Sequence, residues 1–251
     1  MNAALENNPL AMARLQQIER DIAAWAKKTI EVKFDYSGTH LFSMMELAHS
    51  YAKRCDDLVG SIRHLLSQNR IVAATIVGRA LIETIATGCF YVYEMHRLIE
   101  LGDRNRVDDR LRRFYAGVKG QSVEPVHVMD AMRHLEKIDG EYITYLDGKY
   151  GIFTRMIDQL RPAGESGSRE SPCEVLSAMR NYDELSEVCH PNGIGTQFLY
   201  PDQSNETETV MKARERFRSA AITSIWQCHH LLKALIRADE LPECYKRKFL
   251  N

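Results

Sequence analysis

The chain has 251 residues, with 33 lysines and arginines against 34 aspartates and glutamates, and a formal net charge of −1. Hydrophobic residues make up 45% of the sequence and charged residues 27%. This apolar fraction excludes an intrinsically disordered chain, and the balanced charge argues against a protein that binds nucleic acid by bulk positive charge alone. We expect one helical domain over residues 1–251, because a chain of this length can bury a sizeable core.

Apolar residues recur at helical spacing along most of the chain. The pattern predicts helices over residues 10–28, 41–69, 71–101, 103–115, 126–138, 152–160, 171–190 and 205–240. The segment 71–92 is apolar nearly all round, which is typical of a helix at the centre of a bundle. Residues 161–172 concentrate Gly, Ser and Pro and predict an exposed loop. The sequence therefore predicts an all-α fold, a multi-helix bundle packed around one central apolar helix.

The same apolar segment is long enough to cross a bilayer. Arg79 and Glu83 lie near its centre, however, and charges at the middle of a membrane are strongly disfavoured. The N-terminal residues lack the basic start and the apolar run of a signal peptide. The six cysteines form no Cys-x-x-Cys pair, which favours reduced thiols. We therefore expect a cytoplasmic protein that does not associate with a membrane.

Arg79 and Glu83 also form the first candidate site. They are four residues apart, so on a helix they share a face and can pair. Because nearly all of their sequence neighbours are apolar, each of the two charges needs a partner. Two interpretations stay open: a structural ion pair that fixes the register of the helix, or the floor of a polar cleft in which both residues are catalytic.

The second candidate site is the segment from Arg180 to Asn192. Tyr182, Ser186 and His190 follow one another at intervals of four residues, so their side chains form one stripe along a helix. His190 lies at the predicted C-terminal end, where the helix dipole favours the protonated imidazole and suits it to act as a general acid or a phosphate-binding cation. If the stripe faces the central apolar helix, it completes a polar site there. The alternative is that these side chains only satisfy polar groups of the interior.

Cys228, His229 and His230 are the densest group of potential metal ligands. Adjacent residues on a helix point about 100° apart, and the group lacks the paired spacings of structural zinc sites. The sequence also contains no phosphate-binding glycine loop, no Gly-x-Ser-x-Gly elbow and no His-Glu-x-x-His motif. We expect neither a metal nor a cofactor.

Two short motifs resemble a known group of proteins. Residues 79–84 read Arg-Ala-Leu-Ile-Glu-Thr, and residues 182–191 read Tyr-Asp-Glu-Leu-Ser-Glu-Val-Cys-His-Pro. The combination is similar to a group of uncharacterised bacterial all-helical proteins that is often compared with the HEPN superfamily of helical nucleases and nucleotide-binding domains. The resemblance covers residues 39–101 and 171–237. It implies a HEPN-like fold, a homodimer, and metal-independent RNA cleavage by an arginine and a histidine, in the context of bacterial defence.

In HEPN ribonucleases the histidine follows the arginine after about four to six intervening residues. Here His190 lies ten positions after Arg180, which on a helix is about 15 Å along the axis. Arg79 is therefore the better geometric partner for His190. Two functions stay open, and with them whether the chain is an enzyme. One is a HEPN-like domain that processes RNA or binds a nucleotide, and the other is a non-enzymatic helical module that dimerises or binds a protein partner.

Overall fold

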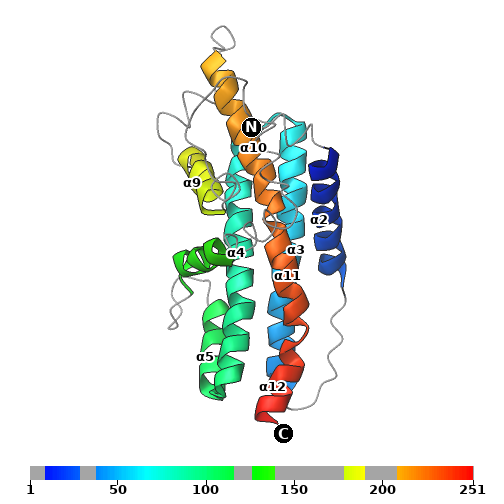
Figure 1. Ribbon diagram of the computed structural model, residues 1–251, viewed down its shortest axis with the longest axis vertical. Helices are drawn as coiled ribbons and strands as arrows, with labels where there is room; N and C mark the ends of the chain where they lie inside the picture. The colour runs from blue at the N-terminus through cyan, green and yellow to red at the C-terminus, as the bar shows by residue number, and fades with distance from the viewer. Residues whose placement is uncertain (1–8, 29–37, 116–125, 139–177, 190–207, 251) are drawn as a thin grey trace. The chain divides into compact units, whose positions relative to one another are not determined.

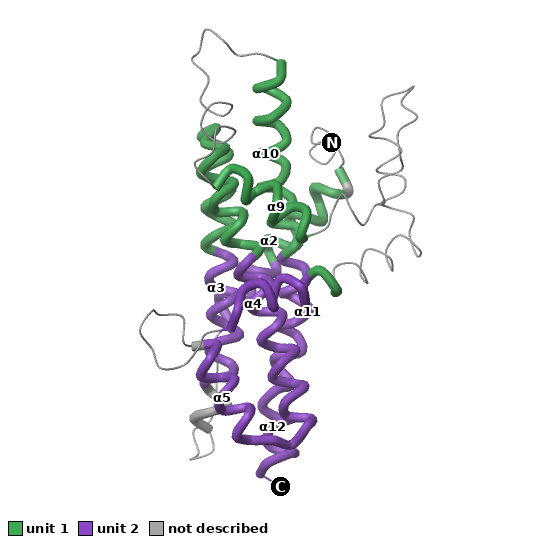
Figure 2. The backbone as a smooth tube through the Cα atoms, turned by 90° about the vertical axis from the view of Figure 1, so that its left-hand side faces the viewer, with its two compact units in different colours: residues 1–20, 57–82, 136–227 green, residues 21–56, 83–135, 228–251 purple. Residues whose placement is uncertain are grey.

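The computed structural model describes residues 9–28, 38–115, 126–138, 178–189 and 208–250, and regular structure in these ranges is helical throughout (Figure 1). The prediction of an all-α fold is confirmed. Contacts divide the chain into two compact units (Figure 2): unit 1 holds residues 1–20, 57–82 and 136–227, and unit 2 holds residues 21–56, 83–135 and 228–251. The predicted helix at 152–160 and the predicted loop at 161–172 lie outside the described residues.

The described helices follow the predicted order, and the helix predicted over residues 126–138 is present over residues 128–138. Their bounds are α2 (Pro9–Lys27), α3 (Gly38–Ser67), α4 (Ile71–Leu101), α5 (Arg104–Tyr115), α9 (Ala178–Cys189), α10 (Glu208–Trp226), α11 (Cys228–Ala238) and α12 (Leu241–Phe249). The helices α2, α3 and α4 each contribute residues to both units.

Helix α4 is the central apolar helix that the sequence predicts. By length and composition alone the helix could cross a membrane, but 56% of its most apolar 18-residue stretch is buried inside the protein. Its fully buried side chains include Leu81 and Ile82 in unit 1 and Ile85 and Met95 in unit 2. The helix ends before Gly102, whose φ of +75° is a left-handed conformation that glycine adopts without steric penalty.

In unit 1, α9 packs against α4 and α10. Val188 of α9 joins a buried cluster with Ile71 of α4 and Phe217 of α10. A Cβ atom on Gly78 of α4 would lie 3.1 Å from the Ser224 hydroxyl of α10. The missing side chain at Gly78 therefore lets the two helices approach closely.

In unit 2, buried polar groups tie α4 to neighbouring helices. The Tyr91 hydroxyl donates to the carbonyl of Met44 on α3 over 2.9 Å, and the Tyr91 ring meets Phe114 of α5 edge-on at 5.0 Å. His96 Nε2 donates to the carbonyl of Arg237, near the end of α11, over 3.0 Å. These bonds satisfy side chains that would otherwise be unfavourable to bury.

The prediction of one long helix over residues 205–240 is wrong. Helix α10 ends at Trp226, Gln227 forms a turn, and α11 begins at Cys228; α12, with a proline in its first turn, then follows α11. Neither glycine nor proline stands at the break, so the sequence contains no local stop signal there. Gln227 is fully buried, which indicates that interior packing determines where the helix breaks.

The same Gly→Ala change is expected to have opposite effects at two helical glycines. At Gly60 an added Cβ meets nothing within 4 Å, so Gly60→Ala should stabilise the protein by about 0.5–1 kcal/mol through helix propensity. At Gly88 the added Cβ would lie 2.7 Å from Leu231 Cδ1 and 3.2 Å from Tyr51 Cγ. Gly88→Ala should therefore destabilise the protein by about 1–2 kcal/mol despite the same gain in propensity. Urea unfolding measures both changes, and equal effects of the two variants would contradict the close packing at Gly88.

Candidate functional site

Tyr182, the first residue of the predicted stripe on α9, meets α4 within unit 1. Arg79 Nη2 donates a hydrogen bond to the Tyr182 hydroxyl over 3.0 Å, and the guanidinium carbon lies 5.0 Å from the centre of the ring. Tyr182 is buried and Arg79 is half-buried. A guanidinium within about 6 Å of an aromatic ring is attracted by the ring electrons as well as by the hydroxyl. Two residues that lie 103 positions apart in the sequence thus contact one another.

The alternation of buried and exposed positions along α9 explains how it presents Tyr182. Its buried face consists of Ala178, Asn181, Tyr182, Leu185 and Val188. The carboxylates of Asp183 and Glu187 lie on the exposed face. Ser186 is half-buried, and its hydroxyl donates to the Tyr182 carbonyl over 2.7 Å. Ser186 therefore contributes a bond within the helix at the position where the sequence predicts a ligand contact.

Glu184 joins α9 to α10. Its side chain is 15% exposed and forms ion pairs with Arg180 at 3.6 Å and with Arg216 at 3.3 Å. Glutamate side chains are mostly solvent-exposed in proteins, but that of Glu184 is largely buried. The four-residue spacing of Arg180 and Glu184 is a signal of the first pair. The second pair joins two separate helices, and no local spacing predicts it.

Asn181 is a functional candidate that the sequence analysis missed. Its side chain is 5% exposed, and Nδ2 has no hydrogen-bond acceptor in the described part of the chain. A buried amide donor without an acceptor is unfavourable by about 1–3 kcal/mol and is uncommon in folded proteins. Such a group is often a sign that a ligand atom completes the site. Asn181 follows Arg180 and precedes Tyr182, so it belongs to the same turn of α9.

The structure describes only some of the remaining predicted site residues. Glu83 is half-buried on α4, one helical turn after Arg79, and its backbone carbonyl accepts a bond from the Thr87 hydroxyl over 2.8 Å. His190 and Asn192 lie outside the described residues. No protein-family model, curated protein or solved structure matches this chain.

A second group of potentially reactive residues lies in unit 2. The thiols of Cys55, Cys89 and Cys228 are buried, and the Cys55 thiol is in hydrogen-bond contact with that of Cys228. Burial is the main cause that raises the pKa of Cys55 and of Cys89, which keeps both as unreactive thiols. Burial also lowers the pKa of His230 to about 3. Among the described residues, no three His, Cys, Asp or Glu side chains form a group that could hold a metal ion.

Proposed function

We propose that this chain binds RNA or a nucleotide in unit 1 and processes RNA without a metal. The supporting observations are the Arg79 guanidinium held against Tyr182 and the buried amide of Asn181, the residue that precedes Tyr182 on α9. Guanidinium, phenol and amide groups all bind the oxygen atoms of phosphate esters. In the proposed reaction the ribose 2′-hydroxyl attacks the adjacent phosphorus, its proton passes to solvent water, and the bond from phosphorus to the 5′ oxygen breaks. Arg79 stabilises the phosphate charge, and His190 protonates the departing oxygen.

Binding in this site would depend on a few specific contacts and little on overall charge. The guanidiniums of Arg180 and Arg216 are paired with Glu184, and α9 also carries Asp183 and Glu187. The affinity for single-stranded RNA should therefore fall only weakly with salt. We expect a slope of log K against log salt of about −1 to −2, which corresponds to one or two phosphate contacts.

Arg79→Gln is the variant that tests the proposed function. It removes the charge but keeps a polar side chain, and loss of one charge-assisted hydrogen bond should weaken RNA binding by roughly tenfold or more. Fluorescence anisotropy with a labelled single-stranded RNA measures the affinity. Gel electrophoresis of the same RNA in the presence of EDTA measures cleavage, which His190→Ala should abolish while leaving the melting temperature nearly unchanged.

Arg70→Gln is the matched control, because Arg70 is an exposed arginine of the same unit. It should leave RNA affinity within about twofold of the wild type, since one exposed charge outside the site contributes little. The proposal fails if the wild-type chain binds no RNA or nucleotide, or if Arg70→Gln weakens binding as much as Arg79→Gln. Binding without cleavage would support a binding domain and contradict the enzymatic role.

A protein-interaction module is the second candidate function. Ile76 of α4 is 48% exposed and Met211 of α10 is 52% exposed, both in unit 1. Exposed large apolar side chains are favourable contacts for a protein partner or a second copy of the chain. If this function is correct, Ile76→Ser with Met211→Ser should abolish self-association in analytical ultracentrifugation, whereas Arg79→Gln should leave it unchanged.

A further inference from the structure

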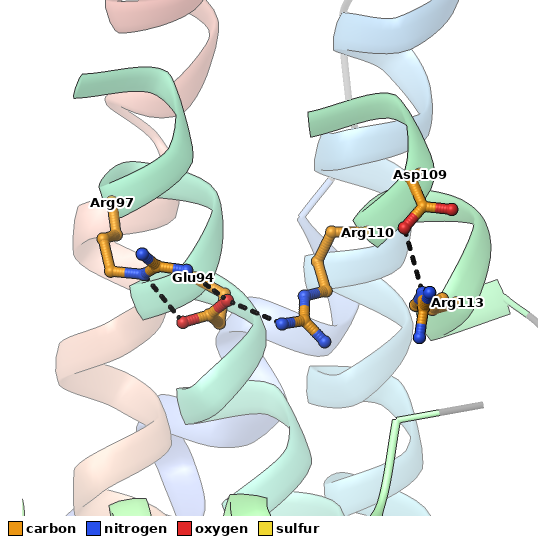
Figure 3. Close-up of polar contacts among 5 residues, drawn as sticks. All are labelled: Glu94, Arg97, Asp109, Arg110 and Arg113. Carbon is orange, nitrogen blue, oxygen red and sulfur yellow. Dashed lines mark hydrogen bonds and ion pairs between the residues drawn. The ribbon is translucent and has the colours of Figure 1, made fainter. Parts of the chain in front are cut away.

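Glu94 in unit 2 is a deeply buried carboxylate that two arginines share. Its side chain is 6% exposed. Arg97 binds both carboxylate oxygens, with Nε 3.0 Å from Oε1 and Nη2 3.1 Å from Oε2, and Arg110 Nη2 lies 3.2 Å from Oε2 (Figure 3). Arg97 comes from the same helix α4, and Arg110 from α5. The buried Glu94 carboxylate therefore orients both guanidiniums.

The shared carboxylate leaves one positive charge in excess. Glu94 neutralises one guanidinium, while the neighbouring Asp109 pairs with Arg113 at 3.0 Å (Figure 3). The side chains of Arg97 and Arg110 are 42% and 32% exposed, so N–H groups that do not contact Glu94 can reach solvent. Helix α5 has five arginines against two aspartates, and one of the five, Arg106, is paired with Asp103 just before the helix. This face of unit 2 thus holds oriented donors and surplus positive charge, which suits a phosphate group.

Aromatic side chains lie on α4 before Arg97. Tyr93 lies one helical turn before Arg97, so the two side chains share a face of α4. The Tyr93 side chain is 42% exposed, and its ring stacks on His134 with the centroids 4.5 Å apart. Phe90 in turn contacts His134 at 5.7 Å. These contacts hold a partly exposed aromatic ring on the same face of α4 as Arg97.

We infer that Tyr93, Arg97 and Arg110 form a binding site for a nucleoside monophosphate unit, either a free nucleotide or one unit of an RNA strand. The two guanidiniums take the phosphate, and the aromatic base stacks on Tyr93, because nucleobases stack on tyrosine rings irrespective of sequence. Glu94 is a positioning residue that orients both arginines. This site lies entirely within unit 2, so it does not depend on the function proposed for Arg79 and Tyr182.

Arg110→Gln is the first test, because it leaves the two bonds between Arg97 and Glu94 in place. We expect calorimetry to show that the wild-type chain binds adenosine 5′-monophosphate, and that Arg110→Gln and Tyr93→Ala each weaken this binding roughly tenfold or more. Arg110→Lys keeps the ion pair with Glu94 but not the planar fork, so it should fold like the wild type and bind with intermediate affinity. Circular dichroism checks the folding of each variant.

Arg113→Gln is the matched control, since it removes the same charge from the same helix at a residue paired with Asp109. It should change the affinity by less than about threefold.

Titration with labelled oligouridine separates the two sources of the ligand. If only binding of the oligomer is weakened by Arg110→Gln, the site binds RNA strands. If binding of the mononucleotide is weakened, the site binds free nucleotides. The inference is overturned if neither probe binds, if inorganic phosphate binds as tightly as the nucleotide, or if Arg113→Gln weakens binding as much as Arg110→Gln. Variants of Arg79 should leave mononucleotide binding at this site unchanged, which keeps its failure distinct from failure of the site in unit 1.

Discussion

Lowering the pH from 7 to 4.5 is expected to destabilise the protein by about 2–3 kcal/mol through His230 alone. His230 is 3% exposed on α11, and burial, aided by the positive charge of Lys233, lowers its pKa to about 3. In the unfolded chain the imidazole binds its proton near pH 6.5. The folded state therefore remains neutral while the unfolded state gains a proton. Stability is complete above about pH 6.5 and is lost as the pH falls from 6.5 towards 3.

His230→Gln isolates this contribution, because glutamine does not titrate. The free energy of unfolding should depend less steeply on pH in the variant, by about 1 kcal/mol per pH unit between pH 6 and pH 4. Urea unfolding at several pH values provides the measurement, and only the pH dependence is compared, since the substitution itself alters a buried contact. His127→Gln, at an exposed position, is the control and should keep the wild-type dependence. An unchanged slope in His230→Gln would show that the imidazole is already protonated, or exposed, in the folded protein.

The helices could be predicted wherever hydrophobic periodicity coincides with a local stop signal. Helix α4 has both, an apolar run that begins at Ile71 and a positive-φ glycine directly after Leu101. The turn at Gln227 has no such signal, and for that reason α10 and α11 were predicted as one helix. Propensity and periodicity describe single segments, whereas this break depends on how the interior packs around a buried glutamine.

Only those features of the candidate site that follow from residue spacing along a single helix could be predicted from the sequence. A four-residue interval along α9 placed Tyr182 in a stripe, and the apolar setting of Arg79 indicated that it needs a partner; the structure brings these two residues together. The pairs of Glu184 with Arg216 and of Glu94 with Arg110 each join two helices. Such contacts depend on tertiary packing, which a single sequence does not encode in any fixed spacing.

Removing both arginines from Glu94 is expected to destabilise the protein far more than removing Glu94 itself. Arg97→Met with Arg110→Met leaves a carboxylate that is 6% exposed without its ion pairs, and an unpaired buried charge is unfavourable by about 3–5 kcal/mol. Glu94→Leu instead leaves two guanidiniums that are 42% and 32% exposed and can be hydrated. We expect the single variant to lose only about 1–2 kcal/mol, chiefly through lost hydrogen bonds.

The triple variant, with Met at 97 and 110 and Leu at 94, distinguishes burial of the charge from loss of packing. Because it replaces the whole ion cluster by apolar groups of similar volume, it should recover most of the stability that the double variant loses. Urea denaturation of all four proteins at pH 7 completes the comparison. If the triple variant is as unstable as the double variant, lost packing by the long arginine stems accounts for the effect, since their methylene groups cover apolar surface. If it recovers, the instability of the double variant comes from the buried carboxylate that has lost its ion pairs, and a triple variant more stable than the wild type would show that the ion cluster itself disfavours folding.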